Sequence, residues 1–541
     1  MSHYRRHDPP APLLFGYDPF RDLPLDHLAR LVEHVVEETV VPPRRERGQP
    51  GQPPYDPRLW VKVLVYSYCT GVRSSRVMER HCRENLPLLF LTRGDAPSYH
   101  TLCTARTEQG EFLEAVWIGL FGVAEAVGIE RLGRITLDST KLRANASPEA
   151  VVTRDEYAAV RAELERIQAE VARVDAQEAA EGSAGRTELG KTVPQEHMRD
   201  ILRRVRRQRR EAQRNAPKPP AARTGRGAVP GSAALPLEGI PEPQAAASPA
   251  PAEAEPAEPM SPKMLQQVAA GIKALQEAEA ERRKHLCLTD PEARMMFGER
   301  ARGTRECHSF EVAVDNGLLV AGQSSQESHD NSRLGPLVAA AQEQEPTGVS
   351  AVDADSGYYA GTAVAALLRE GIDTCIPDSN TAGDLHRGQA IGTTQDRTRG
   401  TVPFTYDAAT DAYHCPEGNV LVRIQHRHQG GQEVTVYRAQ EPCVECPQRT
   451  DCLTRENAKH RTLKVADDHE ILEAARQRFG KAEHQDRYHH RGEKVETVFG
   501  FLRGTLGYTR WLLRGAKKVA CEAKLFKNAY QFRKVHRAWA G

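Results

Sequence analysis

The sequence has no apolar run as long as the roughly 18 residues that a membrane-spanning helix needs, and its mean hydropathy is −0.58. Its first ten residues, MSHYRRHDPP, lack the apolar stretch of a secretory signal. Several of the 11 cysteines, among them Cys69, Cys82 and Cys103, lie in apolar helical patterns, as small hydrophobic residues do. These features predict a protein of the reducing cytoplasm with no membrane partner.

The chain also has almost no net charge, +1 from 74 basic and 73 acidic residues, but the two signs are separated along it. Residues 199–214 contain eight arginines against two acids, and residues 503–541 contain ten basic residues against one acid, Glu522. An acidic tract rich in Pro and Ala lies near 238–258. Basic segments of this size predict a polyanionic partner.

The length of 541 residues allows about two to four domains, of which residues 1–130 are predicted to form a helical one. Asp56-Pro57 is a helix start and Gly71 a helix stop, and residues 59–66 between them are apolar nearly all round, as in a buried helix. The next basic residues are spaced by 3, 4 and 3, so one helical face carries Arg73, Arg76, Arg80 and Arg83. Such a face is either solvated or laid on a phosphate backbone. Together with a capped helix at 98–106, it favours a helix-turn-helix-like DNA-binding unit.

A helical insertion is predicted at residues 150–285. Apolar residues from Tyr157 to Val174 step by 3, 4, 3, 4 and 3, the spacing of a coiled-coil seam, and helical spacing resumes from Met264 to Leu275. Between these segments, residues at about 215–260 are rich in Pro, Ala and Glu and are predicted to be a disordered linker. The expected structure is a helical hairpin with a flexible tip.

A mixed sheet is predicted from strands on both sides of this insertion. Residues 133–138 alternate apolar and polar, and the strand is expected to end at Asp138. Asn316-Gly317 between the apolar runs 309–314 and 318–323 predicts a hairpin. The pattern is completed by a helix near 336–344, a strand that ends at Asp355, a helix at 362–369 and a strand at 372–376.

This order of elements predicts an α/β fold of the RNase H-like kind, a mixed sheet flanked by helices. Strands that are joined through a helix should be parallel and connected with a right-handed crossover. In such a sheet the first and fourth strands are neighbours, so Asp138 and Asp355 are expected side by side. The catalytic domain would comprise residues 131–149, 286–380 and 481–541.

A third carboxylate lies on a helix near the end of the chain. One face of this helix carries Val495, Val498, Phe499 and Leu502. Glu496 lies at the margin of that face, either as a solvated residue or as a metal ligand beside a polar cleft. Two carboxylates at adjacent strand ends and one on a following helix are the minimum set for two Mg²⁺ ions. Asp138, Asp355 and Glu496 are therefore predicted as catalytic metal ligands.

Residues 381–480 form a second predicted insertion, which holds clustered cysteines. Four thiolates, one pair with CxxC spacing, can close a tetrahedral Zn²⁺ site, and here they are Cys415, Cys443, Cys446 and Cys452. The second pair lacks CxxC spacing, so a histidine could substitute for a thiol, from among His414, His426 and His428. The other interpretation is a group of unligated thiols.

At this point the chain resembles the bacterial insertion-sequence transposases of the DDE type. The matching segments are residues 137–145 (LDSTKLRAN), residues 355–358 (DSGY), and Tyr488-x2-Arg491 leading to Glu496-x6-Arg503. The last is similar to the Tyr-Arg-Glu-Lys signature of the family, with one extra residue before the Glu and Arg in place of Lys. The longer spacing leaves Glu493 as a rival to Glu496, and Asp353 rivals Asp355.

The resemblance implies a metal-dependent DNA strand-transfer enzyme. Asp138, Asp355 and Glu496 would bind two Mg²⁺ ions, for which Mn²⁺ can substitute; water would cut at the element ends, and the freed 3′-OH would attack target DNA. The candidate DNA contacts are Arg73, Arg76, Arg80, Arg83, Lys141, Arg143, Tyr488, Arg491 and Arg503. The partners would be double-stranded DNA, as terminal inverted repeats and target, and further copies of the chain in a homodimer or larger synaptic assembly. The protein would be nucleoid-associated.

Two other functions remain open from the sequence. One is an RNase H-like nuclease without strand transfer, and the other is a domesticated DNA-binding protein derived from a transposase. Inverted repeats beside the gene would argue against the first, and loss of a carboxylate would favour the second.

Overall fold

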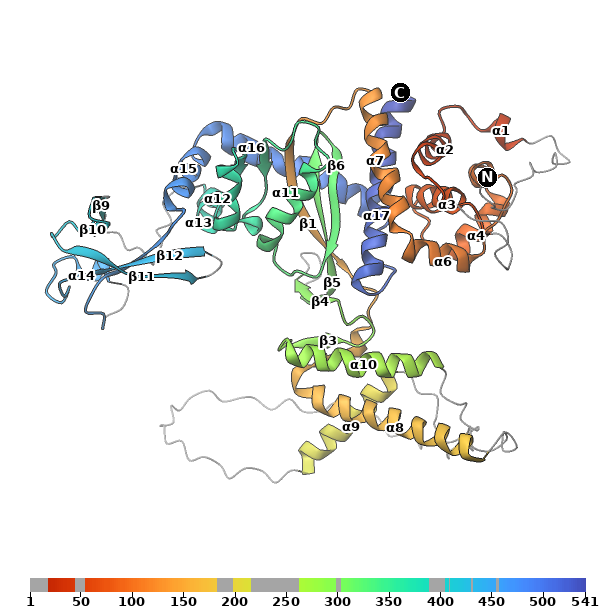
Figure 1. Ribbon diagram of the computed structural model, residues 1–541, viewed down its shortest axis with the longest axis horizontal. Coiled ribbons are helices and arrows are strands. Elements are labelled where there is room, and N and C mark those ends of the chain that lie inside the picture. Colours follow the sequence, from red (N-terminus) through yellow and green to blue (C-terminus); the bar gives the residue numbers. More distant parts are fainter. Residues whose placement is uncertain are drawn as a thin grey trace, which may run out of the picture. The chain divides into compact units, whose positions relative to one another are not determined.

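The computed structural model describes residues 18–43, 54–181, 198–215, 262–297, 303–388, 404–407, 409–429, 432–453 and 457–541 (Figure 1). Contacts divide the chain into two units, residues 1–145 with 292–541, and residues 146–291. Nearly all of the predicted linker, residues 216–260, lies outside the described residues. No helix in the described ranges is long and apolar enough to cross a membrane.

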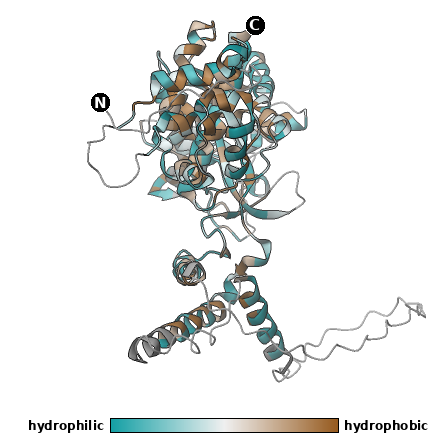
Figure 2. Cartoon of the chain, turned by 90° about the vertical axis from the view of Figure 1, so that its right-hand side faces the viewer, coloured by the Kyte–Doolittle hydropathy of each residue, from teal (hydrophilic) through white to brown (hydrophobic). Residues whose placement is uncertain are grey.

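The N-terminal part of the first unit is helical, as predicted. Its helices are α1 (Pro19–Asp22), α2 (Leu28–Thr39), α3 (Pro57–Cys69), α4 (Ser75–Glu84), α5 (Leu86–Thr92), α6 (Tyr99–Glu108) and α7 (Gly110–Ala126). Asp56 caps α3 by accepting a hydrogen bond from the Arg58 amide at 2.9 Å. Every residue of α3 except Arg58 is buried, so the prediction of a buried helix is confirmed. Figure 2 shows apolar residues gathered in the helices at the middle of this unit.

The sheet that follows has the predicted topology. Its strands are β1 (Arg134–Arg143), β4 (Arg294–Phe297), β5 (Thr304–Asp315), β6 (Leu318–Ser325), β7 (Ala351–Asp353) and β8 (Asp373–Cys375). They are ordered β4-β5-β1-β7-β8, and β6 also pairs with β5. β1 is antiparallel to β5 and parallel to β7, and β7 is parallel to β8. The first and fourth predicted strands are therefore neighbours, and the RNase H-like fold is confirmed.

The β5–β6 hairpin turns at Asn316-Gly317, as predicted. Both residues have positive φ, 45° and 78°, which is the conformation of a type I′ turn. The edge strand β4, which pairs with the first residues of β5, was not predicted.

Two strand boundaries were wrong. β7 ends at Asp353, so Asp355 lies two residues beyond it, and Asp138 does not end β1, which runs on to Arg143. β5 is long enough to pair with β1 from Thr136 to Arg143, and this pairing keeps the backbone extended beyond the apolar alternation. Lys141 and Arg143 therefore lie on the strand itself, and Asp138 lies in its middle.

Helices flank the sheet and close the unit. They include α11 (Leu334–Gln342), α12 (Gly361–Arg369), α13 (Ser379–His386), α15 (His469–Phe479), α16 (Ala482–Gly500) and α17 (Ala516–Ala540), with short turns η4 (Asn331–Arg333) and η5 (Ser356–Tyr358). α17 contacts β6 as well as α3 and α7, so it joins the N-terminal helices to the sheet (Figure 1). Much of this basic tail is thereby buried: Glu522 and Lys527 are 0% and 3% exposed.

A buried carboxyl pair lies just after α11, where Glu345 meets Asp315 at the end of β5. The Asp315 carboxylate accepts a hydrogen bond from the Gly133 amide at 2.8 Å. The pKa of Glu345 is raised to about 7, first by burial and then by the charge of Asp315. The pair therefore opposes ionisation of Glu345 in the folded chain.

Glu345→Gln is expected to raise the melting temperature at pH 8 and to leave it almost unchanged at pH 4.5. The pKa of Glu345 in the folded state, about 7, lies above its ordinary value of 4.5. The stability that goes with this shift is fully present below pH 4.5 and is lost as the pH rises through 7. Glutamine stays neutral, so the variant avoids that loss. Scanning calorimetry at both pH values tests this, with the exposed Glu343→Gln as the control; an equal change at both would contradict it.

The second unit has its own core. It contains α8 (Tyr157–Glu181), α9 (Met198–Asn215), α10 (Pro262–Ala280) and a two-stranded sheet of β2 (Val151–Thr153) and β3 (His285–Cys287). A hairpin of two helices was predicted, but α9 shares the core through Ile201, Leu202 and Val205. In Figure 2 the helices of this unit carry apolar and polar residues along their length.

Part of the arginine cluster on α9 is paired within this second unit. Arg204 lies 2.6 Å from Glu163, Arg206 lies 3.0 Å from Glu156, and Arg209 lies 2.6 Å from Asp155. Arg203 also lies 3.0 Å from Glu149, so the cluster is tied to acidic residues of this unit at several points.

The cysteine-bearing segment forms a small antiparallel sheet. Its strands are β9 (Thr405–Asp407), β10 (Ala412–His414), β11 (Val420–Gln429), β12 (Gln432–Ala439) and β13 (Thr462–Ala466), in the order β13-β12-β11-β10-β9, and α14 (Arg449–Cys452) follows β12.

Candidate active site

The strand pairing brings Asp138 and Asp355 to one place. In the parallel pair β1 and β7, Thr136 lies opposite Asp353, and each of the two candidate aspartates comes two residues later in its chain segment. Asp138 is half-buried and accepts a hydrogen bond from the Ser139 amide at 2.7 Å. Asp355 is half-buried and caps η5, with the Gly357 amide donating at 2.9 Å.

The electrostatics of Asp138 reflect this proximity. Its pKa is raised to about 6, first by burial, with a further rise from the charges of Asp355 and Asp330. The Ser139 amide and the Arg491 guanidinium oppose the rise. A nearby cation stabilises the charged form of a carboxylate that is partly desolvated and lies beside other carboxylates. This place therefore favours the binding of a cation.

The rival residue Asp353 has a different environment. It is 4% exposed and accepts from the Arg487 guanidinium at 2.5 Å, with the Lys494 ammonium 3.6 Å away. Arg487 also pairs with Asp373 on the next strand. Asp353 therefore helps to attach α16 to the sheet, and its charge is compensated.

Tyr488 and Arg491 on α16 lie at the two aspartates. Arg491 lowers the pKa of Asp138, and its guanidinium lies 5.3 Å from the centre of the Tyr488 ring. Burial raises the pKa of Tyr488, and the charge of Asp355 raises it further. The Nε and Nη1 atoms of Arg491 are buried and have no hydrogen-bond partner in the described part of the chain. They are available to an anionic ligand.

The two candidate glutamates are not brought to the aspartates. Val495, Val498 and Phe499 are buried, as the helical stripe predicted, but Glu493 and Glu496 are both exposed. Glu496 Oε1 lies 3.7 Å from the position that a Cβ on Gly492 would take, so its side chain extends along its own helix. Across the described ranges, no three His, Cys, Asp or Glu side chains are arranged to hold a metal ion. Arg503, seven residues after Glu496, lies over the Phe499 ring, with its guanidinium carbon 5.6 Å from the ring centre.

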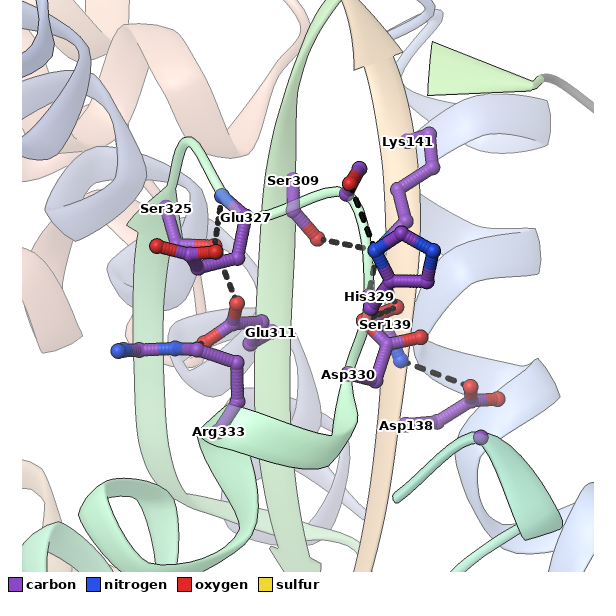
Figure 3. A network of polar contacts seen from close by, with 12 residues as sticks. Asp138, Ser139, Lys141, Ser309, Glu311, Ser325, Glu327, His329, Asp330 and Arg333 are labelled. Atoms are coloured by element: carbon purple, nitrogen blue, oxygen red, sulfur yellow. Dashed lines mark hydrogen bonds and ion pairs between the residues drawn. The ribbon is translucent and has the colours of Figure 1, made fainter. Parts of the chain in front are cut away.

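Lys141 lies in a polar network that the sequence did not reveal (Figure 3). Its ammonium donates to Asp330 at 2.6 Å, to Ser309 at 3.0 Å and to Ser139 at 3.1 Å. Asp330 precedes η4, in a loop whose composition indicates only a turn. Arg143, at the end of the same strand, is exposed.

Tyr358, the last residue of the matching segment 355–358, also lies in this region. It is fully buried, and its hydroxyl has no hydrogen-bond partner in the described segments. Its pKa is raised well above the usual value, first by burial and then by the charges of Asp330, Glu311, Asp138 and Asp355. The phenol of Tyr358 is therefore buried within the electrostatic influence of four carboxylates.

The arginine stripe of the N-terminal helices is shorter than predicted. Arg73 lies before the cap residue Ser74, so it is not on α4, and its side chain is 10% exposed. It donates to the buried Glu522 at 2.8 Å and lies 4.8 Å from the centre of the Tyr508 ring. Arg73 is therefore a structural residue, and the exposed stripe consists of Arg76, Arg80 and Arg83.

The four predicted cysteines line one pocket with Arg461 and Phe404. Burial raises the pKa of Cys452, and the neighbouring thiols of Cys443, Cys446 and Cys415 raise it further. The three alternative histidines do not line the pocket; they lie beside carboxylates, for example His426 at 2.8 Å from Asp467. The candidate donor set is thus four sulfurs, a ligand type that suits Zn²⁺. In the described part of the chain, however, these thiols are not arranged to hold a metal ion.

Two segments of the chain match the models of known protein families. Residues 17–108 match the family described as transposase domain (DUF772), and residues 414–536 match the family described as transposase DDE domain. The second match includes Glu496 and the four cysteines but neither aspartate. No curated protein matches the chain. A DDE transposase domain generally implies the use of a divalent metal and action on DNA. The two matches support an insertion-sequence transposase of the DDE type.

Proposed function

We propose that this transposase uses Mg²⁺ to cut the ends of its insertion sequence and joins the freed 3′-OH ends to target DNA. The observation that supports it best is the proximity of Asp138, on β1, to Asp355, two residues beyond the neighbouring parallel strand β7, next to the unpartnered guanidinium nitrogens of Arg491. This arrangement places an acidic and a basic group where a phosphodiester needs both.

The residues at this place fit divalent cations. Among the described residues, neither Asp138 nor Asp355 forms an ion pair with a neighbouring side chain, whereas Asp353 pairs with Arg487. Asp138 is also partly shielded from water, which raises its pKa. Mg²⁺ takes one or two carboxylates and keeps water and phosphate oxygens as its other ligands. Glu496 is the third proposed ligand and would have to turn from its own helix. Bound ions would supply the charge that activates the attacking oxygen and stabilises the leaving one.

The basic residues around the aspartates would hold the DNA. Arg491 presents two buried nitrogens, and a guanidinium can bind a phosphate through two parallel hydrogen bonds. Tyr488 fixes that guanidinium from one side through its ring. Lys141 lies on the strand of Asp138, while Arg143 and Arg503 would contact phosphates further from the scissile bond.

The test is cleavage of a plasmid that carries the gene with its flanking DNA, in Mg²⁺ and in EDTA. Cuts at fixed positions in the flanks, only with metal, are expected. A chain that binds the flanks but never cuts them would support the DNA-binding alternative instead. Because two ends must be cut together, we also propose a homodimer or larger assembly.

The exposed stripe on α4 is proposed to contact phosphates at the element ends. Replacing Arg76, Arg80 and Arg83 together by Ala should lower the slope of log affinity against log salt by about 0.9 for each phosphate that is no longer neutralised. Fluorescence anisotropy with a labelled duplex from the flanking DNA measures this slope. If the triple variant keeps the wild-type slope, these arginines are only a solvated surface.

A structural Zn²⁺ ion is proposed for the pocket of the four cysteines. Purified protein should contain one zinc per chain by elemental analysis, and Cys443→Ser or Cys446→Ser should lose it, because a structural site needs all four ligands. Cys103→Ser, at a cysteine of α6 far away in the sequence, is the control. Zinc-free protein that is folded and active would remove this proposal.

A further inference from the structure

We propose that Asp330 is a positioning residue of the catalytic centre, which holds the Lys141 ammonium in place to receive a DNA phosphate beside Asp138. The inference deepens the proposed function and rests on it. It concerns a residue on the loop before η4, far in sequence from all three predicted carboxylates.

The hydrogen bonds of Lys141 carry the argument. An ammonium has three donors, and here they reach one carboxylate and two hydroxyls, Asp330 Oδ1, Ser139 Oγ and Ser309 Oγ. Asp330 Oδ1 also accepts from Ser139 Oγ at 3.0 Å, so it links both partners on β1 (Figure 3). Lys141 and Asp330 are only 16% and 19% exposed, which distinguishes this pair from a solvated surface pair.

A phosphate could bind this ammonium only by replacing one of its present partners. The two serine hydroxyls are neutral and form the weaker bonds, whereas the bond to Asp330 is charge-assisted and the shortest of the three. The phosphate would therefore replace a serine, while Asp330 keeps the ammonium at its place.

The surroundings of Asp330 are those of the catalytic centre. Its Oδ2 atom lies 3.7 Å from the position of a Cβ on Gly357, in the turn that Asp355 caps. The unpartnered, fully buried hydroxyl of Tyr358 lies within the field of both Asp330 and Asp138. An unsatisfied buried donor at this point indicates a site that a ligand completes.

The test is a double-mutant cycle on the full chain, with Asp330→Asn, Lys141→Gln and both together. The readouts are single-turnover Mg²⁺-dependent cleavage of the plasmid with flanking DNA, and the salt dependence of binding to a labelled flanking duplex. We expect cleavage to fall roughly 100-fold in each single variant, because a misplaced phosphate contact costs that much. The double variant should be no slower than Lys141→Gln, since Asp330 acts through Lys141.

The binding readout separates positioning from a structural role. Lys141→Gln and Asp330→Asn should each lower the salt slope by about 0.9, and Asp330→Glu should partly restore both readouts. Glu327→Gln, which removes a charge from the same loop without touching Lys141, should behave as wild type. Wild-type cleavage by Asp330→Asn, or losses that multiply in the double variant, would overturn the inference. If wild-type protein does not cleave, the proposed function fails, and unchanged salt slopes would then overturn this inference as well.

Discussion

Asp138→Asn and Asp355→Asn should each abolish cleavage at the element ends, with a loss of at least roughly 1,000-fold. Either change keeps the shape of the side chain and removes one negative charge from the pair that would hold the metal. DNA affinity should remain, because Arg491, Lys141 and the stripe on α4 are untouched. The measurement is the single-turnover rate in Mg²⁺, with flanking-DNA binding measured alongside.

These two variants should fold as well as the wild type. The pKa of Asp138 is raised to about 6 by burial and by neighbouring carboxylates, so its charge opposes folding at neutral pH when no metal is bound. The melting temperature in EDTA at pH 7.5 should therefore stay the same or rise. Asp353→Asn is the matched comparison: it removes one of the two carboxylate partners of Arg487 and should lower the melting temperature instead. Full activity in either catalytic variant would contradict the assignment.

Glu496→Gln should be inactive, while Glu493→Gln should cut at the wild-type rate. Both glutamates lie on α16 and both are exposed, so the two changes remove the same charge from the same helix. Glu496 adjoins the buried Val495 and Val498, and its side chain can turn toward the sheet that α16 packs against. The same plasmid cleavage assay compares them, and equal binding to flanking DNA is the control. An inactive Glu493→Gln beside an active Glu496→Gln would shift the third ligand by one turn of the helix.

The meeting of Asp138 and Asp355 could be predicted because it depends on strand order alone. Alternation in residues 133–138, the Asn316-Gly317 turn and the helix-joined strands determine which strands are neighbours. Strand length could not be predicted in the same way, because the pairing of β1 with the long β5 extends it beyond its own apolar pattern.

Side-chain environments were harder to predict than strand order. Arg73 has the spacing of the α4 stripe, but the helix begins only at Ser75, and the partner Glu522 is hundreds of residues away. Asp330 lies in a loop, where no periodicity separates a turn residue from a functional one. The orientation of Glu496 likewise depends on its rotamer, which a helical pattern does not determine.

The most direct test of the central proposal is strand joining by purified protein. Wild-type chain, a plasmid carrying the gene with its flanks, and a separate target plasmid are incubated with Mg²⁺, and the junctions are sequenced. We expect joined molecules whose element ends are constant and whose target carries a short duplication, and no such molecules with Asp138→Asn. Cuts in the flanks without any joined product would contradict the proposal and indicate a nuclease without strand transfer.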